Sequence, residues 1–127
     1  INLYDYKIWY NYLDIYSDKG NSDKVFEIIN IMNEMYSIPI TINVHNYVLN
    51  CYLKQISKSR EYSTRVSISK KGLQYIDTNI DCDINETTLY YKTLLYLNIM
   101  NSKDINDSIK DEYFIKINED ILEEYKE

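Results

Sequence analysis

The clearest pattern in the chain is SDKVFEIINIMNEMY, residues 22–36. Its apolar side chains recur at intervals of three and four residues, which places them on one face of an α-helix. That face carries Val25, Ile28, Ile29, Met32, Met35 and Tyr36, and the opposite side carries Asp23, Lys24, Glu27 and Asn30. We therefore predict an amphipathic helix over residues 22–36, with its apolar face packed against other helices.

Residues that favour helix ends flank this helix. Before it, Gly20 stands in a polar turn at residues 18–21, where it can adopt the left-handed conformation that ends a preceding helix. Asn21 or Ser22 can then cap the new helix. After it, Pro39 lacks an amide hydrogen and restricts the backbone of the residue before it, so the helix must end there.

Helical spacing continues upstream and downstream. Residues 6–17 place Trp9, Tyr12, Leu13 and Tyr16 on one helix face. Further helices are predicted over residues 43–57, 60–77, 87–100 and 104–125. The helix over 60–77 is the least regular, because residues 66–69 alternate apolar and polar as a strand does and Gly72 lowers helix stability.

The composition agrees with long helices joined by short turns. Only two Gly and one Pro occur among 127 residues, whereas an all-β sandwich needs more of both. Hydrophobic residues make up 45%, which argues against a disordered chain. We predict an all-α fold, an α-solenoid of about three antiparallel helix–turn–helix hairpins, with units at residues 5–41, 42–86 and 87–125. We expect these units to be a fragment of a longer array.

The charge balance bears on the class of partner. Asp and Glu number 20 against 14 Lys and Arg, which gives a formal net charge of −6. Such acidity counts against a free-standing nucleic-acid binder, because phosphate contacts dominate the affinity of those proteins. One basic stretch runs through the second unit and consists of Lys54, Lys58, Arg60, Arg65, Lys70 and Lys71. It is either an ordinary solvated helix face or, if RNA is bound, the path of the RNA backbone.

No motif of catalysis or cofactor binding stands out. His45 is the only histidine, so a catalytic triad or a histidine-bound metal would have to use it, and we expect it on the surface at the start of a helix. Cys51 and Cys82 lack the spacing of a zinc site and are expected to be buried, reduced thiols. No apolar run approaches the roughly 20 residues that span a membrane. We therefore expect no enzyme activity, cofactor, metal, small-molecule substrate or membrane contact.

The first unit contains several features in a characteristic order. Its first helix reads Ile8-Trp9-Tyr10-Asn11-Tyr12-Leu13, Tyr16 and Gly20-Asn21 follow, and the second helix runs through Met32 and Met35 to Ile38-Pro39. In this order the residues resemble a pentatricopeptide repeat, an RNA-binding hairpin of roughly 35 residues. The resemblance covers residues 5–41. It is weaker in the later units, whose Leu49 and Leu94 align with Leu13 at spacings of 36 and 45 residues.

The resemblance implies binding of single-stranded RNA in a mitochondrion or another organelle. In this family an aliphatic residue early in each repeat holds a base, a polar residue three positions later selects it, and a residue at the end of the repeat assists. The resemblance assigns the first role to Ile8, Val44 and Leu89, the second to Asn11, Tyr47 and Lys92, and the third to Thr41 and Glu86. Only Asn11 is a usual selecting residue, since an amide both donates and accepts at a base edge.

The chain departs from the family in having no Ala, which the family commonly uses where paired helices touch. We therefore expect the helices to pack farther apart or with a shifted geometry. Two other functions stay open. The hairpins could form a non-catalytic scaffold that contacts protein subunits of a larger assembly such as an organellar ribosome, which the negative charge favours. Alternatively, a compact helical-bundle regulator could grip a partner helix.

Overall fold

Six α-helices make up most of residues 5–101 and 106–124, which are the residues that the computed structural model describes. They are α1 (Tyr6–Asp18), α2 (Ser22–Asn30), α3 (Ile42–Lys58), α4 (Tyr62–Asn79), α5 (Glu86–Met100) and α6 (Asp107–Glu124), and a π-helical turn, η1 (Ile31–Met35), extends α2. These residues contain no β-strand, so the predicted all-α class is confirmed. The predicted limits of the last helix, residues 104 and 125, lie outside the described part of the chain.

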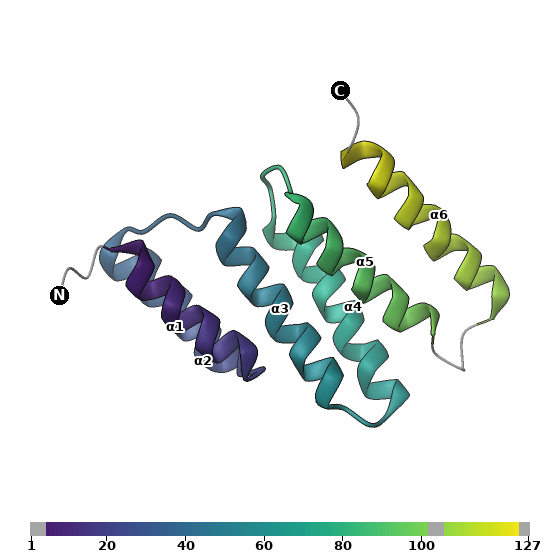
Figure 1. Ribbon diagram of the computed structural model, residues 1–127, viewed down its shortest axis with the longest axis horizontal. Coiled ribbons are helices and arrows are strands. Elements are labelled where there is room, and N and C mark those ends of the chain that lie inside the picture. The colour runs from purple at the N-terminus through teal and green to yellow at the C-terminus, as the bar shows by residue number, and fades with distance from the viewer. Residues whose placement is uncertain (1–4, 102–105, 125–127) are drawn as a thin grey trace.

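The helices lie in a row, which Figure 1 shows from α1 and α2 at one side to α6 at the other. Sequence neighbours pack together, as α1 with α2, α3 with α4 and α5 with α6, and the pairs meet where α2 packs on α3 and α4 packs on α5. In addition, α3 packs against both α1 and α5. As a result α1, α3 and α5 form one continuous layer with α3 in its middle.

The apolar interior is divided along this row. One cluster fills the space among α1, α2 and α3 and consists of Trp9, Leu13, Val25, Ile28, Met32, Ile38, Val44, Val48, Cys51 and Tyr52. The other lies among α3, α4 and α5 and consists of Leu49, Ile56, Ile76 and Leu95. Full burial of each large aliphatic side chain stabilises the fold by roughly 1.5–3 kcal/mol. In the third hairpin the fully buried leucine is Leu95, one residue beyond the Leu94 that the sequence aligns with Leu13.

The first turn of the chain has the conformation that its residues predict. Gly20 has a φ of +70°, a left-handed conformation that closes α1 without strain because glycine has no Cβ. The side-chain oxygen of Asn21 accepts a hydrogen bond from the amide of Lys24 and so caps α2. Gln55 of α3 donates to the carbonyl of Gly20 at 3.0 Å, which ties the turn to the neighbouring hairpin.

The end of α2 differs from the prediction. The π-helical turn η1 fits more residues into one turn than an α-helix does, which rotates its last residues and those that follow about the helix axis. Met35, expected on the apolar face, is therefore 70% exposed, and Ile38 beyond the helix is buried instead. Ser37 takes a positive φ of +54°, and the amide of Ile38 donates to the carbonyl of Met32 at 2.9 Å. The helix thus ends at Tyr36, as predicted, and two non-helical residues precede Pro39.

Close helix contact is achieved here without Ala. A Cβ atom added to Gly72 of α4 would lie 2.8 Å from Cδ1 and 3.1 Å from Cδ2 of Leu95 on α5. Ser69, one turn earlier in α4, is fully buried and donates its hydroxyl to the carbonyl of Arg65. Ser17 is likewise fully buried in α1. Glycine and serine thus take the place of Ala where helices touch. Helix α4 forms through residues 66–72, although the sequence pattern there was the least regular.

The last helix, α6, packs on α5 through three kinds of contact. The rings of Tyr96 and Tyr113 lie 5.6 Å apart, and Lys92 Nζ pairs with Asp120 Oδ2 at 3.1 Å. Ile117 is buried. Other apolar side chains of α6 remain exposed, namely Ile109, Phe114, Ile115, Ile121 and Leu122.

The contact at Gly72 can be tested by substitution. Gly72→Val should lower the free energy of unfolding by about 1–3 kcal/mol, because the added atoms must displace the fully buried Leu95. Helix propensity alone would change stability in the opposite direction, since Val favours a helix more than Gly does. Lys71→Val, at the exposed neighbouring position, is the matched control. Urea denaturation measures the free energy of unfolding of both variants. If Gly72→Val is as stable as Lys71→Val, the proposed role of Gly72 is wrong.

Candidate binding groove

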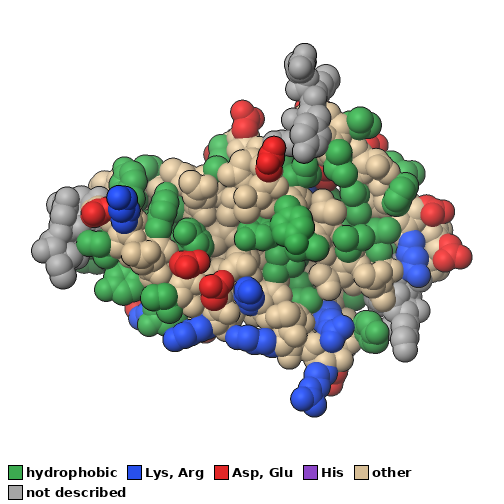
Figure 2. All heavy atoms as spheres, viewed as in Figure 1, with side chains coloured by type: hydrophobic (Ala, Val, Ile, Leu, Met, Phe, Trp, Pro, Cys, Tyr) green, Lys and Arg blue, Asp and Glu red, His purple; other side chains and the backbone are tan. Residues whose placement is uncertain are grey.

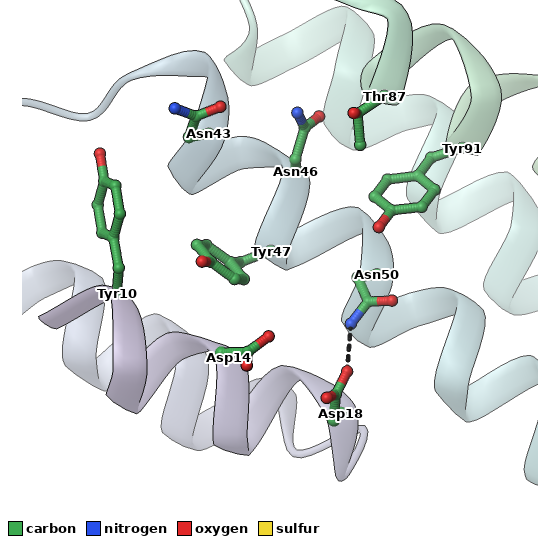
Figure 3. Close-up of a pocket in the computed structure, with 9 residues that line it drawn as sticks. All are labelled: Tyr10, Asp14, Asp18, Asn43, Asn46, Tyr47, Asn50, Thr87 and Tyr91. Atoms are coloured by element: carbon green, nitrogen blue, oxygen red, sulfur yellow. Dashed lines mark hydrogen bonds between the residues drawn. The ribbon is translucent and has the colours of Figure 1, made fainter. Parts of the chain in front are cut away.

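A cavity of about 330 Å³ opens on the layer formed by α1, α3 and α5. Its lining consists of Tyr10, Asp14 and Asp18 from α1, Asn43, Asn46, Tyr47 and Asn50 from α3, and Thr87 and Tyr91 from α5 (Figure 3). Within each helix these residues recur three or four positions apart, which is the spacing of side chains on one helix face. We call this cavity the groove, and all three helices of the layer contribute to it.

Hydrogen bonds hold α1 against α3 at the edge of the groove. The hydroxyl of Ser17 donates to the carbonyl of Tyr47 at 2.7 Å. The amide of Asn50 donates to Ser17 Oγ at 2.7 Å. It also donates to Asp18 Oδ1 at 3.0 Å, the bond drawn in Figure 3. Because Ser17 is fully buried, its hydroxyl needs these partners, and the bonds fix the rotation of α1 relative to α3.

A second buried network holds α3 against α5. The hydroxyl of Thr88 donates to Asn46 Oδ1 at 2.6 Å, and the amide of Asn46 donates to Asn85 Oδ1 at 3.1 Å. Asn85 also accepts a hydrogen bond from the backbone N–H of Thr88 and so caps α5. Thr88 is fully buried and Asn46 is 8% exposed, so this network is shielded from water and its bonds are strengthened.

Tyrosine rings form the aromatic part of the groove. The rings of Tyr10 and Tyr47 lie 5.9 Å apart and bridge α1 and α3. The hydroxyl of Tyr10 lies 3.1 Å from Thr41 Oγ1 at the start of α3. Tyr91 reaches from α5 toward the same space (Figure 3). A ligand in the groove would meet ring faces together with polar hydroxyl groups.

The groove carries negative charge. Asp14 and Asp18 both line it, whereas none of its lining residues is Lys or Arg. Burial raises the pKa of the Tyr47 hydroxyl, and the Asp14 carboxylate adds to that rise. Burial likewise raises the pKa of Tyr91, with a further contribution from Asp18. Burial is the larger cause of both shifts, and the smaller contribution of Asp14 and Asp18 reflects a negative potential that favours a cation.

The residues expected to hold RNA bases are not gathered in the groove. Val44 is fully buried and Leu89 is 7% exposed, so both belong to the interior and present almost no surface to a base. Ile8 is half-buried. Two residues were expected to assist at the ends of repeats. Thr41 is hydrogen-bonded to the hydroxyl of Tyr10, and Glu86 is exposed in the first turn of α5.

The three residues expected to select bases have different surroundings. Tyr47 lines the groove. Asn11 is exposed on α1 and lies outside the groove lining. Lys92 of α5 forms an ion pair with Asp120 of α6 and lies over the Tyr96 ring. The structure therefore does not align these three positions toward one ligand path.

The predicted basic stretch is divided in space. Lys54, Lys58 and Arg60 are exposed around the turn between α3 and α4, and Figure 2 shows Lys and Arg side chains along the lower edge of the molecule, where this turn lies in Figure 1. Lys70 and Lys71 are exposed farther along α4. Arg65 is half-buried, donates from Nε to the carbonyl of Ser59 at 2.8 Å and lies over the ring of Tyr62.

His45 is not on the surface, contrary to expectation. It is 6% exposed, and its Nδ1 lies 2.8 Å from the hydroxyl of Tyr75 on α4. Burial lowers the pKa of His45, and the nearby Asp81 carboxylate opposes this shift. In the described part of the chain no three His, Cys, Asp or Glu side chains are grouped as metal ligands.

The expectation for the cysteines is correct at one position. Cys51 is buried, and its burial raises the thiol pKa to about 11. Cys82 is exposed in the segment between α4 and α5, so the prediction that it is buried is wrong. Both are free thiols.

Sequence reasoning missed most of the groove. The usable signal was polar residues at helical spacing, such as Asn43, Asn46 and Asn50, or Asp14 and Asp18. Each set resembles an ordinary solvated helix face when its helix is considered alone. Only the packing of α1, α3 and α5 as neighbours shows that the sets face one another.

The buried histidine predicts a pH-dependent stability. Because the folded protein holds the pKa of His45 below 6.5, the unfolded chain binds a proton at a higher pH than the folded protein does. The contribution of His45 to the free energy of unfolding should be complete above about pH 7. It should decrease as the pH falls through the pKa of His45 in the unfolded chain toward its lower pKa in the folded protein. Urea denaturation across this range measures it. His45→Gln should reduce the slope of stability against pH, and an unchanged slope would contradict the assignment.

The two thiols should differ in reactivity toward a disulfide reagent such as Ellman's reagent. Cys82 should react rapidly, whereas Cys51 should react slowly because its thiol is buried and protonated at neutral pH. Cys82→Ser should therefore remove the rapid phase from the native protein. A rapid phase that persists in this variant would show that Cys51 is accessible.

Comparisons with known proteins assign no family to the chain. A scan against protein-family models finds no match, and searches of curated proteins and of solved structures find none either. None of the helices in the described residues is both long and apolar enough to cross a membrane. We therefore base the function on the geometry and chemistry of the groove.

Proposed function

We propose that this chain is a segment of an α-solenoid built from three stacked helix–turn–helix hairpins, and that it binds another protein through the groove without catalysing a reaction. The order of helix contacts supports the stacking. Each hairpin meets the next through their first helices, and the second helix of one hairpin packs on the first helix of the next. Repeat proteins of this kind bind ligands on an extended surface formed by equivalent helices of successive units.

The lining of the groove is the observation that carries the proposal. It combines two carboxylates, three amides and three tyrosines with no basic side chain. Phosphate groups would be repelled by Asp14 and Asp18, because nucleic-acid affinity depends on neutralising phosphate charge. Tyrosine and asparagine instead suit a protein partner, since the ring supplies rigid contact area and the amide pairs with peptide groups.

Single-stranded RNA is the second candidate ligand, and a separate surface favours it. Lys54, Lys58 and Arg60 are exposed around the turn between α3 and α4. Exposed cations that follow one another in this way suit a phosphate backbone. An RNA strand would then run along this edge and would avoid the acidic groove.

Two probes distinguish the candidates, a displayed library of random peptides and a labelled pool of random single-stranded RNA. We expect the library to yield peptides that bind the purified protein, and the RNA pool to show no binding near physiological salt. Thr87→Trp should weaken peptide binding about tenfold or more, because a bulky ring at this exposed lining position fills the groove. Thr64→Trp, at an exposed position of α4 outside the groove lining, is the matched control.

The opposite results would overturn the proposal. If Thr87→Trp and Thr64→Trp leave peptide binding equally strong, the peptides do not occupy the groove. If no peptide is selected and the RNA pool binds, the protein is an RNA binder. In that case Lys54→Glu with Lys58→Glu should reduce the salt dependence of the RNA affinity.

A further inference from the structure

We infer that the groove binds an extended peptide segment by taking up one of its Lys or Arg side chains, an inference that rests on the proposed protein-binding function. Two carboxylates on one helix face, three tyrosine rings and a line of asparagine amides meet in this cavity. Each group has a separate part in recognising such a segment.

The carboxylates provide the charge. Asp14 and Asp18 are one helical turn apart on α1, and both side chains lie on the side of α1 that faces α3 (Figure 3). Among the described residues neither forms an ion pair with a Lys or Arg side chain. Asp18 accepts one hydrogen bond, from Asn50, which leaves further acceptor positions on its carboxylate. The pair can therefore accept several N–H groups from one incoming cation.

The tyrosines provide a surface for the stem of the cationic side chain. Lys and Arg side chains bury their methylene groups on apolar surface while the charged end reaches polar groups. Tyr10 and Tyr47, with rings 5.9 Å apart, border the space that leads to Asp14, and Tyr91 borders it from α5 (Figure 3). A cation near a ring face gains further attraction from the electron density of that face. Rings and carboxylates therefore favour the same ligand.

The asparagines can hold the peptide backbone. Asn43 is exposed, and its side-chain amide has no hydrogen-bond partner among the described residues. Asn50 uses its N–H groups on Ser17 and Asp18, so its carbonyl oxygen can still accept a hydrogen bond. Asn43 and Asn50 are two turns apart along α3, roughly 10 Å, which matches about three residues of extended chain. A short extended segment along α3 can thus contact both amides.

The charge requirement is tested with two peptides that differ in one functional group. A peptide from the library selection is synthesised with Arg and with citrulline at its basic position, because citrulline keeps the shape of Arg and lacks its charge. Fluorescence anisotropy should show roughly fivefold to tenfold tighter binding of the Arg peptide, the combined effect of an ion pair and a ring contact. The preference should diminish at high salt.

Substitution of the carboxylates identifies the site. Asp14→Asn with Asp18→Asn should remove the preference for Arg over citrulline, and the amide introduced by Asp18→Asn still offers an acceptor oxygen to Asn50. Asp111→Asn with Glu119→Gln, on exposed positions of α6, is the matched control with the same change of net charge. Circular dichroism and thermal melting check that each variant folds. If the double variant unfolds, Asp14→Asn alone, which disturbs no hydrogen bond among the described residues, should reduce the preference.

The results separate this inference from the proposed function. If selected peptides lose affinity in Thr87→Trp but bind equally with Arg and citrulline, the groove binds protein and the inferred cation is wrong. If the Arg preference persists in the variants of Asp14 and Asp18, the cation is recognised elsewhere and the inference is also wrong. If free spermine at micromolar concentration displaces the peptide and binds with the same dependence on Asp14, the groove recognises small polyamines instead. If no peptide binds, the proposed function itself fails.

Discussion

The position of α3 between α1 and α5 is the constraint on which the rest of this structure depends. Helix α3 contributes apolar side chains to both interior clusters, but apolar contacts are non-directional and would tolerate several rotations of the helices. The buried hydrogen bonds remove that freedom. Ser17 and Asn50 fix α1, and Asn46 and Thr88 fix α5. Since polar groups out of water must be paired, each network restricts the rotation of the helix that it joins to α3.

This rotation also determines the chemistry of the exposed face. The same amide of Asn50 that binds buried Ser17 also binds Asp18 at the edge of the groove. Packing and recognition therefore share residues, and a change in the helix contacts would move the carboxylates as well. The resulting surface combines negative charge with aromatic rings, so a chain whose first hairpin resembles an RNA-binding repeat can present a face that suits a protein partner.

The sequence predicted the local structure well and the site poorly, for a physical reason. Helix spacing, Gly20 and Asn21 act through neighbours in the chain, so the helix bounds and the first turn could be derived. Met35 was misplaced because the regular helical spacing does not reveal the π-helical turn to which it belongs. His45 was misplaced because its partner, Tyr75, lies thirty residues away in the chain. Val44 and Leu89 are covered for the same kind of reason. An aliphatic residue is buried or accessible to a ligand according to which helices pack beside it.

The attachment of α6 has a consequence for how the molecule opens. Helices in a row are coupled mainly to their neighbours, and α6 packs mainly on α5. Among the described helices α3 packs on α1, α2, α4 and α5, so the backbone amides of α6 should exchange with solvent before those of α3, through local opening and without global unfolding. Such opening would leave the layer of α1, α3 and α5 in place. Helix α6 can then detach and return while a ligand stays bound in the groove, so that occupancy of the groove and attachment of α6 vary independently.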